Sequence, residues 1–446
     1  MERTVAIGIQ NFNEIIENNY FYVDKTSFIK EWWESGDSVT LITRPRRFGK
    51  TLNMSMVEQF FSVNYAGRGE LFEGLSIWQE EKYVKLQGTY PVISLSFANV
   101  KEKTYEQTKQ RICRLIAELY EKQRFLIESD ILSEQEKVFF LGVDKDMPEE
   151  TATFALHKLA DFLCRYYGKK VIILLDEYDT PMQEAYVDGY WEELVAFTRS
   201  LFNSTFKTNP WLERAIMTGI TRVSKESIFS DLNNLKVVTT TSDEYATSFG
   251  FTENEVFAAL DECSLSDKKE DVKRWYDGFI FGKQRDIYNP WSIINYLDKG
   301  KLGTYWANTS SNSLVGKLLR EGNRSIKEKF ETLLTEGTIC SPIDEQIVYK
   351  IANAYQNKLG LFSRSEIEEL TGYNSDYVER IMKRSTGKTL SAYGKTFLLK
   401  KAADMLTDTD KKVGDICELL GYSNRNYFNK LFFKEYGMTP SEYRKS

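Results

Sequence analysis

The chain has 446 residues, of which 42% are hydrophobic and 14% aromatic. This length and composition predict two to four globular domains and exclude a disordered chain. The longest aliphatic run, residues 171–175, is too short to span a bilayer and no signal peptide is recognisable, so we expect no membrane contact. Five scattered cysteines without a CxxC pair predict a reducing, cytoplasmic location, and the single histidine argues against histidine-rich metal sites.

The net charge of −6 is unevenly distributed. From Lys350 onward basic residues outnumber acidic ones by 17 to 12, whereas the rest of the chain holds 42 basic and 53 acidic residues. A basic C-terminal region on an acidic body is typical of a DNA-binding module on a larger protein, although an excess of this size also arises by chance.

The first 234 residues alternate short apolar segments with amphipathic ones. We expect strands at 38–43, 91–97, 171–175 and 214–218, and helices at about 50–62, 105–126, 151–167 and 190–206. Because the strands are continuously rather than alternately hydrophobic, both of their faces should be covered. This pattern predicts an α/β domain with a parallel sheet and flanking crossover helices over residues 1–234.

Residues 41–51 read LITRPRRFGKT and lie between a predicted strand and a predicted helix, which is the context of a P-loop. In such a loop, backbone N–H groups and the helix N-terminus bind phosphates. We expect Lys50 to reach the β- and γ-phosphates of ATP and the Thr51 hydroxyl to bind Mg²⁺. The full set of predicted nucleotide contacts is Arg46, Arg47, Phe48, Gly49, Lys50 and Thr51. A general P-loop has glycine where this chain has Arg44, so a chance GKT is the alternative for this segment taken alone.

The apolar run 171–175 ends in two carboxylates, as the acidic strand of a P-loop NTPase does. We expect Asp176 to hold Mg²⁺ through its water shell and Glu177 to orient and deprotonate the attacking water. Thr218, at the end of the next apolar run, could contact the γ-phosphate or that water, and Arg222 could stabilise phosphate charge. The alternative is a solvated acidic loop, but the GKT upstream favours the nucleotide site.

Residues 235–346 have a different pattern, with short helical stretches and aromatic-rich loops such as WYDGFIFG and IYNPWSI. They predict a smaller, mostly helical second domain.

A series of segments over roughly residues 7–343 resembles, in order, the bacterial predicted AAA-ATPase family: FYVDKTSFIK, LITRPRRFGKTLNMSM, LFEGLSIW, YPVISLSF, LLDEYDTPM, TGITRVSKESIFSDLNNLKVV, WYDGFIFG, IYNPWSI and NTSSN. That family also carries RPRRFGK in place of a glycine-led loop. The resemblance implies ATP binding by Lys50 and Thr51 with Asp176 and Glu177 as the acidic pair, and hydrolysis of ATP to ADP and phosphate as a hypothesis. Members usually continue into a PD-(D/E)XK nuclease-like domain, whereas no D…ExK carboxylate set follows here.

Residues 347–446 predict an all-α tail with an approximate repeat. SRSEIEELTGYNSDYVERIMKRSTGKTL and KVGDICELLGYSNRNYFNKLFFKEYGMTP share a helix, a GY turn and a second helix, and a helix at 392–406 would join the two units. In the second unit we expect a turn at Gly421 and a cap at Ser423 or Asn424. We expect the helix that follows the cap to bury a face that comprises Tyr427, Phe428, Leu431 and Phe432.

The tail resembles the tandem helix-turn-helix domain of the AraC/XylS family of transcription regulators. The resemblance implies that the second helix of each unit enters the major groove of double-stranded DNA. The base-facing candidates are Arg425, Asn426, Asn429 and Lys430 in the second unit and Ser375 and Arg380 in the first. Asp376 and Glu379 share the face of the first unit and are unfavourable beside phosphates. A helical protein-interaction module is the alternative for this tail.

These features predict a sequence-specific DNA-binding transcriptional regulator with an N-terminal ATP-binding switch, which could also hydrolyse ATP and self-associate. The alternative is a DNA-tethered ATPase of a defence or mobile-element system, in which the tail replaces the usual nuclease-like domain. A third hypothesis is a fusion of two decayed halves near Val348.

Overall fold

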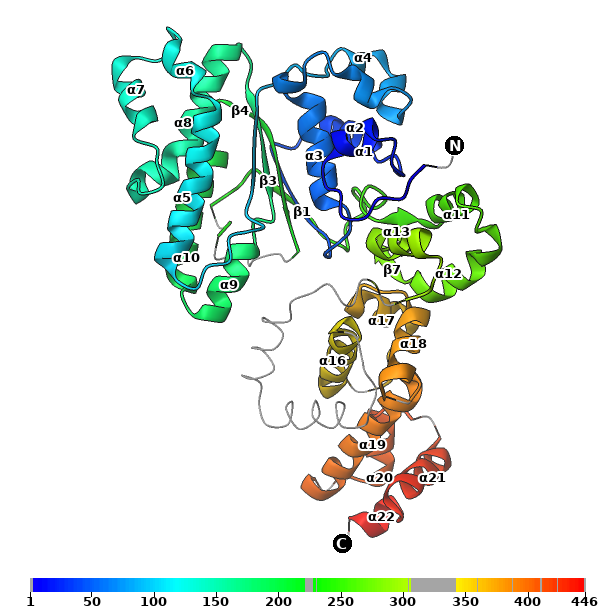
Figure 1. Ribbon diagram of the computed structural model, residues 1–446. Helices are drawn as coiled ribbons and strands as arrows, with labels where there is room; N and C mark the ends of the chain where they lie inside the picture. The colour runs from blue at the N-terminus through cyan, green and yellow to red at the C-terminus, as the bar shows by residue number, and fades with distance from the viewer. Residues whose placement is uncertain are drawn as a thin grey trace.

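A computed structural model of the protein describes residues 3–220, 228–229, 231–303, 305, 342–358, 360–386, 388–409, 411–422 and 424–444 (Figure 1). Among these residues no helix combines the length and the hydropathy needed to cross a membrane.

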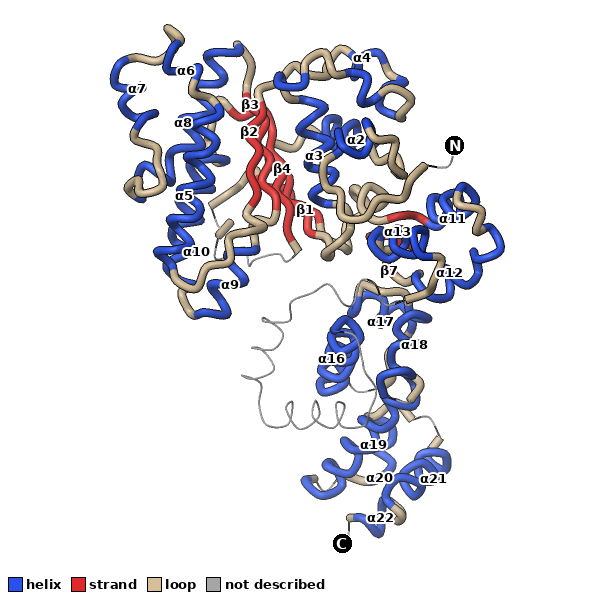
Figure 2. Tube along the Cα trace, in the orientation of Figure 1, coloured by secondary structure: helices blue, strands red, loops and turns tan. Residues whose placement is uncertain are grey.

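A parallel sheet forms the centre of the N-terminal unit, and its described strands follow the order β2-β3-β4-β1-β5 (Figure 2). The strands are β1 (Val39–Thr43), β2 (Val92–Ser96), β3 (Val171–Asp176), β4 (Leu212–Gly219) and β5 (Leu235–Val238). Strand β4 pairs with both β1 and β3, so that Ile42 lies beside Thr218 and Leu175 beside Met217. The carboxyl ends of β1, β4 and β3 therefore meet at one edge of the sheet.

Helices cover both faces of this sheet (Figure 1). One face carries α1 (Phe12–Glu17), α2 (Ser27–Ser35), α3 (Lys50–Phe61), α4 (Glu81–Val84) and the 3-10 turns Val63–Tyr65, Gly69–Phe72 and Ser76–Gln79. The other carries α5 (Tyr105–Lys122), α6 (Phe125–Glu128), α7 (Glu134–Leu141), α8 (Glu149–Tyr167), α9 (Thr180–Asp188) and α10 (Trp191–Phe206). Within β3, Ile172 and Leu174 pack into the core on the α3 side, whereas Ile173 and Leu175 pack into the core on the α8 side. The predicted doubly covered parallel sheet is confirmed.

A small α/β unit follows β5. Its elements are β6 (Phe251–Thr252), α11 (Glu253–Glu262), the 3-10 turn Ser266–Lys268, α12 (Lys269–Tyr276), β7 (Phe279–Phe281), β8 (Gln284–Tyr288) and α13 (Pro290–Lys299). The described strands form an antiparallel sheet in the order β6-β8-β7. The sequence did not predict this sheet, because strands of two to five residues are too short to display a period. The parallel sheet also extends past the boundary drawn at residue 234, since β5 pairs with β1.

The tail is helical, as predicted, and comprises α16 (Pro342–Asn357), α17 (Arg364–Thr371), α18 (Ser375–Thr386), α19 (Leu390–Asp408), α20 (Val413–Leu419), α21 (Arg425–Tyr436) and α22 (Pro440–Tyr443). It contains two separate hydrophobic cores. Ile351, Ile367 and Met382 belong to the first, and Ile416 and Phe428 belong to the second. Helices α17–α18 and α20–α21 form the two helix-turn-helix units, and α19 joins them (Figure 1).

Candidate nucleotide site and helix-turn-helix surfaces

The carboxyl edge of the parallel sheet brings Thr51, Asp176 and Thr218 together. The Thr51 hydroxyl donates to Asp176 Oδ2 over 2.7 Å, and the Thr218 hydroxyl donates to Asp176 Oδ1. Asp176 is almost completely buried, so both of its carboxylate oxygens are satisfied by hydroxyls rather than by water. Thr51 and Asp176, which are 125 positions apart, therefore meet as the sequence predicted, with Thr218 of the intervening strand beside them.

The oxygen donors at this edge suit Mg²⁺. That ion is usually held by one or two carboxylates together with waters and the phosphates of a nucleotide, not by a cage of protein ligands. The part of the chain that the structure describes contains no group of three or more His, Cys, Asp or Glu side chains placed to hold a metal. The Thr51 hydroxyl and the Asp176 carboxylate therefore fit an ion that arrives with a nucleotide.

Lys50 is bonded to the loop that precedes it. Its Nζ donates to the carbonyl oxygens of Arg44 and Pro45, each over 3.0 Å. Burial lowers the pKa of Lys50, and the nearby Glu177 and Asp176 oppose that shift. A charged phosphate oxygen would be a stronger acceptor than two neutral carbonyls. We expect Lys50 to exchange these bonds for phosphate when a nucleotide binds.

Arg44, at the position where a general P-loop has glycine, is a fully buried structural residue. Its guanidinium donates to the carbonyl of Thr239 over 2.6 Å and to that of Glu244 over 3.2 Å, and it lies 4.7 Å from the ring centre of Phe281. Burial lowers the pKa of Arg44 to about 10, so the side chain stays charged at neutral pH. Arg44 fixes the loop against residues 239–249 and does not present its charge to a ligand.

The loop residues before Lys50 have distinct surroundings. Arg47 and Gly49 adopt positive φ values of 66° and 81°. The Arg47 guanidinium is exposed and lies 4.2 Å from the ring centre of Trp291, while the half-buried Arg46 offers its carbonyl to the Asn289 amide at 3.5 Å. The backbone N–H groups at the start of α3 receive no side-chain cap among the described residues, which leaves them for an anion.

Phe48 was predicted to contact the nucleotide, but its side chain is fully buried. Its ring packs 4.7 Å from Phe279 and 5.4 Å from Phe281 of the small antiparallel sheet. Only the Phe48 backbone can therefore reach a phosphate, and the ring sets the position of the loop.

Glu177 follows Asp176 in a strained conformation. Its φ is 52°, its N–H donates to the Thr218 hydroxyl over 3.4 Å, and its carboxylate accepts from the Thr180 hydroxyl over 3.1 Å. A non-glycine residue in this region is uncommon and marks a position held by its surroundings. Glu177 thus lies directly beside the Asp176–Thr218 pair, whereas Arg222 lies outside the described residues.

The second helix-turn-helix unit presents polar residues to solvent. The Asn424 side chain caps α21 by accepting from the Tyr427 N–H over 3.1 Å. Arg425, Asn426 and Lys430 are exposed, and Asn429 is half-buried with no donor to its Oδ1 among the described residues. Phe428 and Phe432 are buried behind them, as predicted.

Tyr427, by contrast, was expected in the buried face and is 46% exposed. Its hydroxyl accepts from Lys395 Nζ over 3.2 Å. It lies on α21 immediately before the buried Phe428, and therefore on a different face of the helix.

In the first unit, fewer of the residues predicted to face DNA are exposed to solvent. Ser375 is 8% exposed, and the Glu379 carboxylate accepts from the Leu390 N–H over 3.0 Å. The Arg380 guanidinium donates to the backbone carbonyl of Asp277, in the small α/β unit, over 3.3 Å. Of the four residues on this face, Asp376 and Arg380 are exposed, and Asp376 Oδ1 lies 3.6 Å from Arg364 Nη2.

Comparison with known proteins assigns both parts of the chain. Residues 6–229, just over half of the chain, match the family described as Predicted AAA-ATPase. The chain belongs to the predicted AAA-ATPase family. Residues 368–446 match a helix-turn-helix domain family, so this AAA-ATPase-family chain carries a helix-turn-helix domain of the AraC type at its C-terminal end.

An uncharacterized protein from the vnfD 5′ region of Azotobacter chroococcum is 26% identical to this chain over 344 residues, which cover 77% of this chain and 61% of that protein. The regulatory protein SoxS of Salmonella typhimurium is 33% identical over 78 residues, which cover 18% of this chain and 73% of SoxS. The C-terminal domain of the two-component response regulator yesN from Fusobacterium nucleatum is 30% identical, with a TM-score of 0.20, over 22% of this chain and 95% of that domain.

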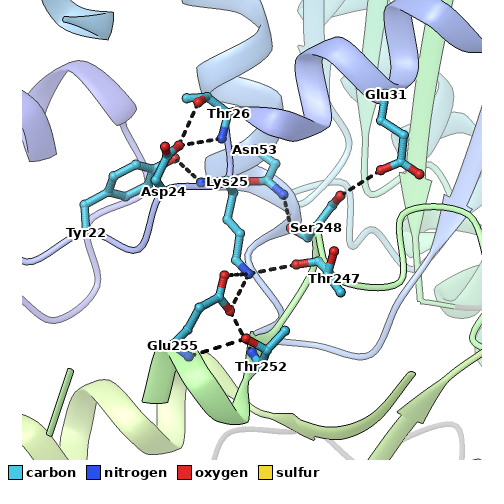
Figure 3. A network of polar contacts seen from close by, with 10 residues as sticks. All are labelled: Tyr22, Asp24, Lys25, Thr26, Glu31, Asn53, Thr247, Ser248, Thr252 and Glu255. Atoms are coloured by element: carbon cyan, nitrogen blue, oxygen red, sulfur yellow. Dashed lines mark hydrogen bonds and ion pairs between the residues drawn. The ribbon is translucent and has the colours of Figure 1, made fainter. Parts of the chain in front are cut away.

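One network in the AAA-ATPase-family part was not predicted from the sequence (Figure 3). Lys25 Nζ donates to the Thr247 carbonyl over 2.7 Å and to the Glu255 carboxylate over 2.6 Å, and the Asn53 amide donates to the Ser248 carbonyl over 2.8 Å. These bonds tie Lys25, just before α2, and helix α3 to residues 247–255, next to the segment that Arg44 holds. The only sequence signal for this network is the VDKT run within FYVDKTSFIK, which does not reveal its distant partners.

Proposed function

We propose that this chain is a DNA-binding transcriptional regulator that reads DNA mainly through α21 and takes ATP as its input. The observation that carries the proposal is the exposed N-terminal half of α21, with Arg425, Asn426 and Lys430 around a helix that Phe428 anchors to the core. Recognition helices present these N-terminal positions to base edges, where Arg suits guanine and Asn suits adenine. The similarity to SoxS, whose name describes a regulatory protein, supports the same function.

ATP binding is supported by the geometry at the carboxyl edge of the sheet. Lys50 would exchange its bonds to two carbonyls for phosphate, and Thr51 with Asp176 would hold Mg²⁺. Mg²⁺ supplies positive charge to the phosphate oxygens when it is bound. Thr218 orients Asp176, and Glu177 is placed to accept a proton from water if hydrolysis occurs. A cytoplasmic location and self-association stay predictions.

The proposal is tested by selecting DNA from a random library with the full-length protein and then measuring affinity for the selected duplex. We expect Arg425→Ala to weaken binding by roughly 1–3 kcal/mol and to relax the preference at one base position. Arg274→Ala removes the same charge from an exposed site on α12 and should leave affinity unchanged. Selection of no preferred sequence, or equal effects of the two substitutions, would contradict sequence-specific binding.

A second candidate function, a DNA-tethered ATPase, is favoured by Thr218 and Glu177, which lie beside Asp176. In that case DNA of any sequence should stimulate phosphate release, and Lys50→Ala and Glu177→Gln should each abolish it. A regulator predicts slow turnover and a preferred DNA sequence. Measuring phosphate release with the selected duplex and with a scrambled duplex separates the two functions.

A further inference from the structure

The first helix-turn-helix unit is attached to strand β7 of the small antiparallel sheet. The Asn374 N–H donates to the Gly278 carbonyl over 2.8 Å, and the Ile280 N–H donates to the Gly372 carbonyl over 3.4 Å. Phe279 and Tyr373 form an isolated antiparallel bridge between them. The turn that introduces helix α18 is therefore paired with β7 as if it were a short additional strand.

Two tyrosines pack on β7 and the residue before it, one from the turn before α18 and one from α18 itself. The Tyr373 ring lies 4.7 Å from the Phe279 ring, and Tyr377 covers Gly278 so closely that a Cβ atom there would lie 2.5 Å from the Tyr377 ring. Arg380, one helical turn further on, donates to the Asp277 carbonyl. Tyr377 is thus held against β7, and Arg380, although exposed, is tied to the residue before Gly278.

An ion pair also links the first helix-turn-helix unit to the β7–β8 hairpin. Arg285 Nη1 and Nη2 donate to the two oxygens of Glu368 over 2.9 and 2.7 Å, in the bidentate geometry of a strong charge-assisted pair. Glu368 is mostly buried, and its carboxylate also accepts from the Ser375 N–H at the start of α18 over 3.1 Å. Glu368 therefore links α17 to the start of α18, and Arg285 fastens Glu368 to strand β8.

We propose that this docking withholds the first unit from DNA, and that nucleotide binding at the β1–α3 loop releases it. The inference rests on the proposed function and concerns how the nucleotide site controls access of the first unit to DNA. A recognition helix must place its N-terminal residues in the major groove, and a duplex that received Arg380 would occupy the position of β7. The exposed Asp376 at the start of α18 would also repel phosphates.

Phe279 links the docked helix to the nucleotide loop. Its ring contacts Tyr373 on the tail and also contacts Phe48, two residues before Lys50, at 4.7 Å in each case. When Lys50 leaves the carbonyls of Arg44 and Pro45 for a phosphate, the loop that carries Phe48 loses two of its hydrogen bonds, and we infer that it shifts. A displaced Phe48 ring would disturb Phe279 and weaken the contact with Tyr373, because packed interfaces do not deform continuously.

The test uses full-length proteins with reversed charges at the ion bridge: Arg285→Glu, Glu368→Arg and the double substitution. We expect Arg285→Glu to tighten DNA binding on the order of tenfold and to steepen its salt dependence, because the first unit then contributes phosphate contacts. A general charge effect would act in the opposite direction, since the substitution adds negative charge. The double substitution should return affinity and salt dependence toward the wild-type values.

Lys283→Glu is the matched control, because it makes the same charge change at a highly exposed position of the same hairpin. It should not tighten binding. ATP should tighten binding by the wild-type protein and have no effect on Arg285→Glu, in which the first unit is already released.

Equal affinity and salt dependence for the wild-type protein and Arg285→Glu would overturn the inference and leave the proposed function standing. Tighter binding by Arg285→Glu with no ATP effect on the wild-type protein would overturn the nucleotide link. Failure of every protein to bind DNA would overturn the proposed function and this inference with it.

Discussion

The two helix-turn-helix units share a local plan and differ in what surrounds them. In each, a glycine with positive φ ends the first helix, at 75° for Gly372 and 77° for Gly421. In each, an asparagine then accepts from the N–H of a tyrosine three residues later, which pairs Asn374 with Tyr377 and Asn424 with Tyr427. Yet Tyr377 packs on strand β7, whereas Tyr427 is exposed on α21.

The difference shows that the surroundings of a helix-turn-helix unit, and not the unit alone, decide which of its faces are exposed. The first unit meets a sheet edge that pairs with its turn, whereas the corresponding helix of the second unit faces solvent. The acidic residues Asp376 and Glu379 are tolerable on a helix that serves as a docking surface, and they would be costly on one that faced phosphates. Sequence differences between the two units thus match their different surroundings.

The largest expected difference in DNA binding between the two units comes from truncating one core side chain in each. Phe428→Ala should cost roughly 3–5 kcal/mol and Met382→Ala roughly 2–5 kcal/mol, because both side chains are fully buried in separate cores. We expect Phe428→Ala to abolish DNA binding and Met382→Ala to leave it within about a factor of three, since only the second unit is engaged in the absence of nucleotide. Thermal melts followed by circular dichroism, together with affinity measurements, check this prediction. Equal loss of binding would place both units on the DNA.

A smaller contrast is expected at equivalent positions of the two recognition helices. Lys430→Ala should weaken DNA binding by roughly 1 kcal/mol through a lost phosphate or base contact. Arg380→Ala should not weaken it, because Arg380 donates to the Asp277 carbonyl. Fluorescence anisotropy with the selected duplex measures both. A comparable loss in the two variants would show that α18 contacts DNA without prior release.

The smallest expected effect is a pH-dependent change in stability at Asp277, which lies just before strand β7. Burial, together with the neighbouring Asp286, raises the pKa of Asp277 to about 7, and Lys273 opposes the shift. Since the folded state holds this proton more tightly than the unfolded state, the group contributes stability at low pH that is lost as pH rises toward 7. Asp277→Asn should therefore stabilise the protein on the order of 1 kcal/mol at pH 8, and the gain should shrink as pH falls to 5. Melting temperatures at the two pH values measure this, and a gain that does not depend on pH would exclude the Asp277 charge as its cause.

Much of the fold was predictable because strong local patterns encode it. The run that ends in Asp176, the GKT before α3 and the repeated GY turns each identify an element from a few neighbouring residues. The contact of Thr51 with Asp176 could also be inferred, since parallel strands bring their carboxyl ends to one edge of the sheet.

What could not be predicted depends on partners distant in sequence. Phe48 lies in a phosphate-binding segment, but its side chain is buried by Phe279, more than 200 residues away. Arg44 looks like a cation for phosphate and is enclosed by carbonyls from residues 239–245. Nothing within the first helix-turn-helix unit reveals that strand β7 covers it. Charge and periodicity are local, whereas burial is decided by the whole chain.

The most direct measurement is hydrogen exchange of the full-length protein with and without its selected DNA duplex, in the absence of nucleotide. We expect DNA to slow exchange in α21 and to leave the amides at the start of α18 unchanged. Equal protection of α18 and α21 by DNA would contradict this expectation.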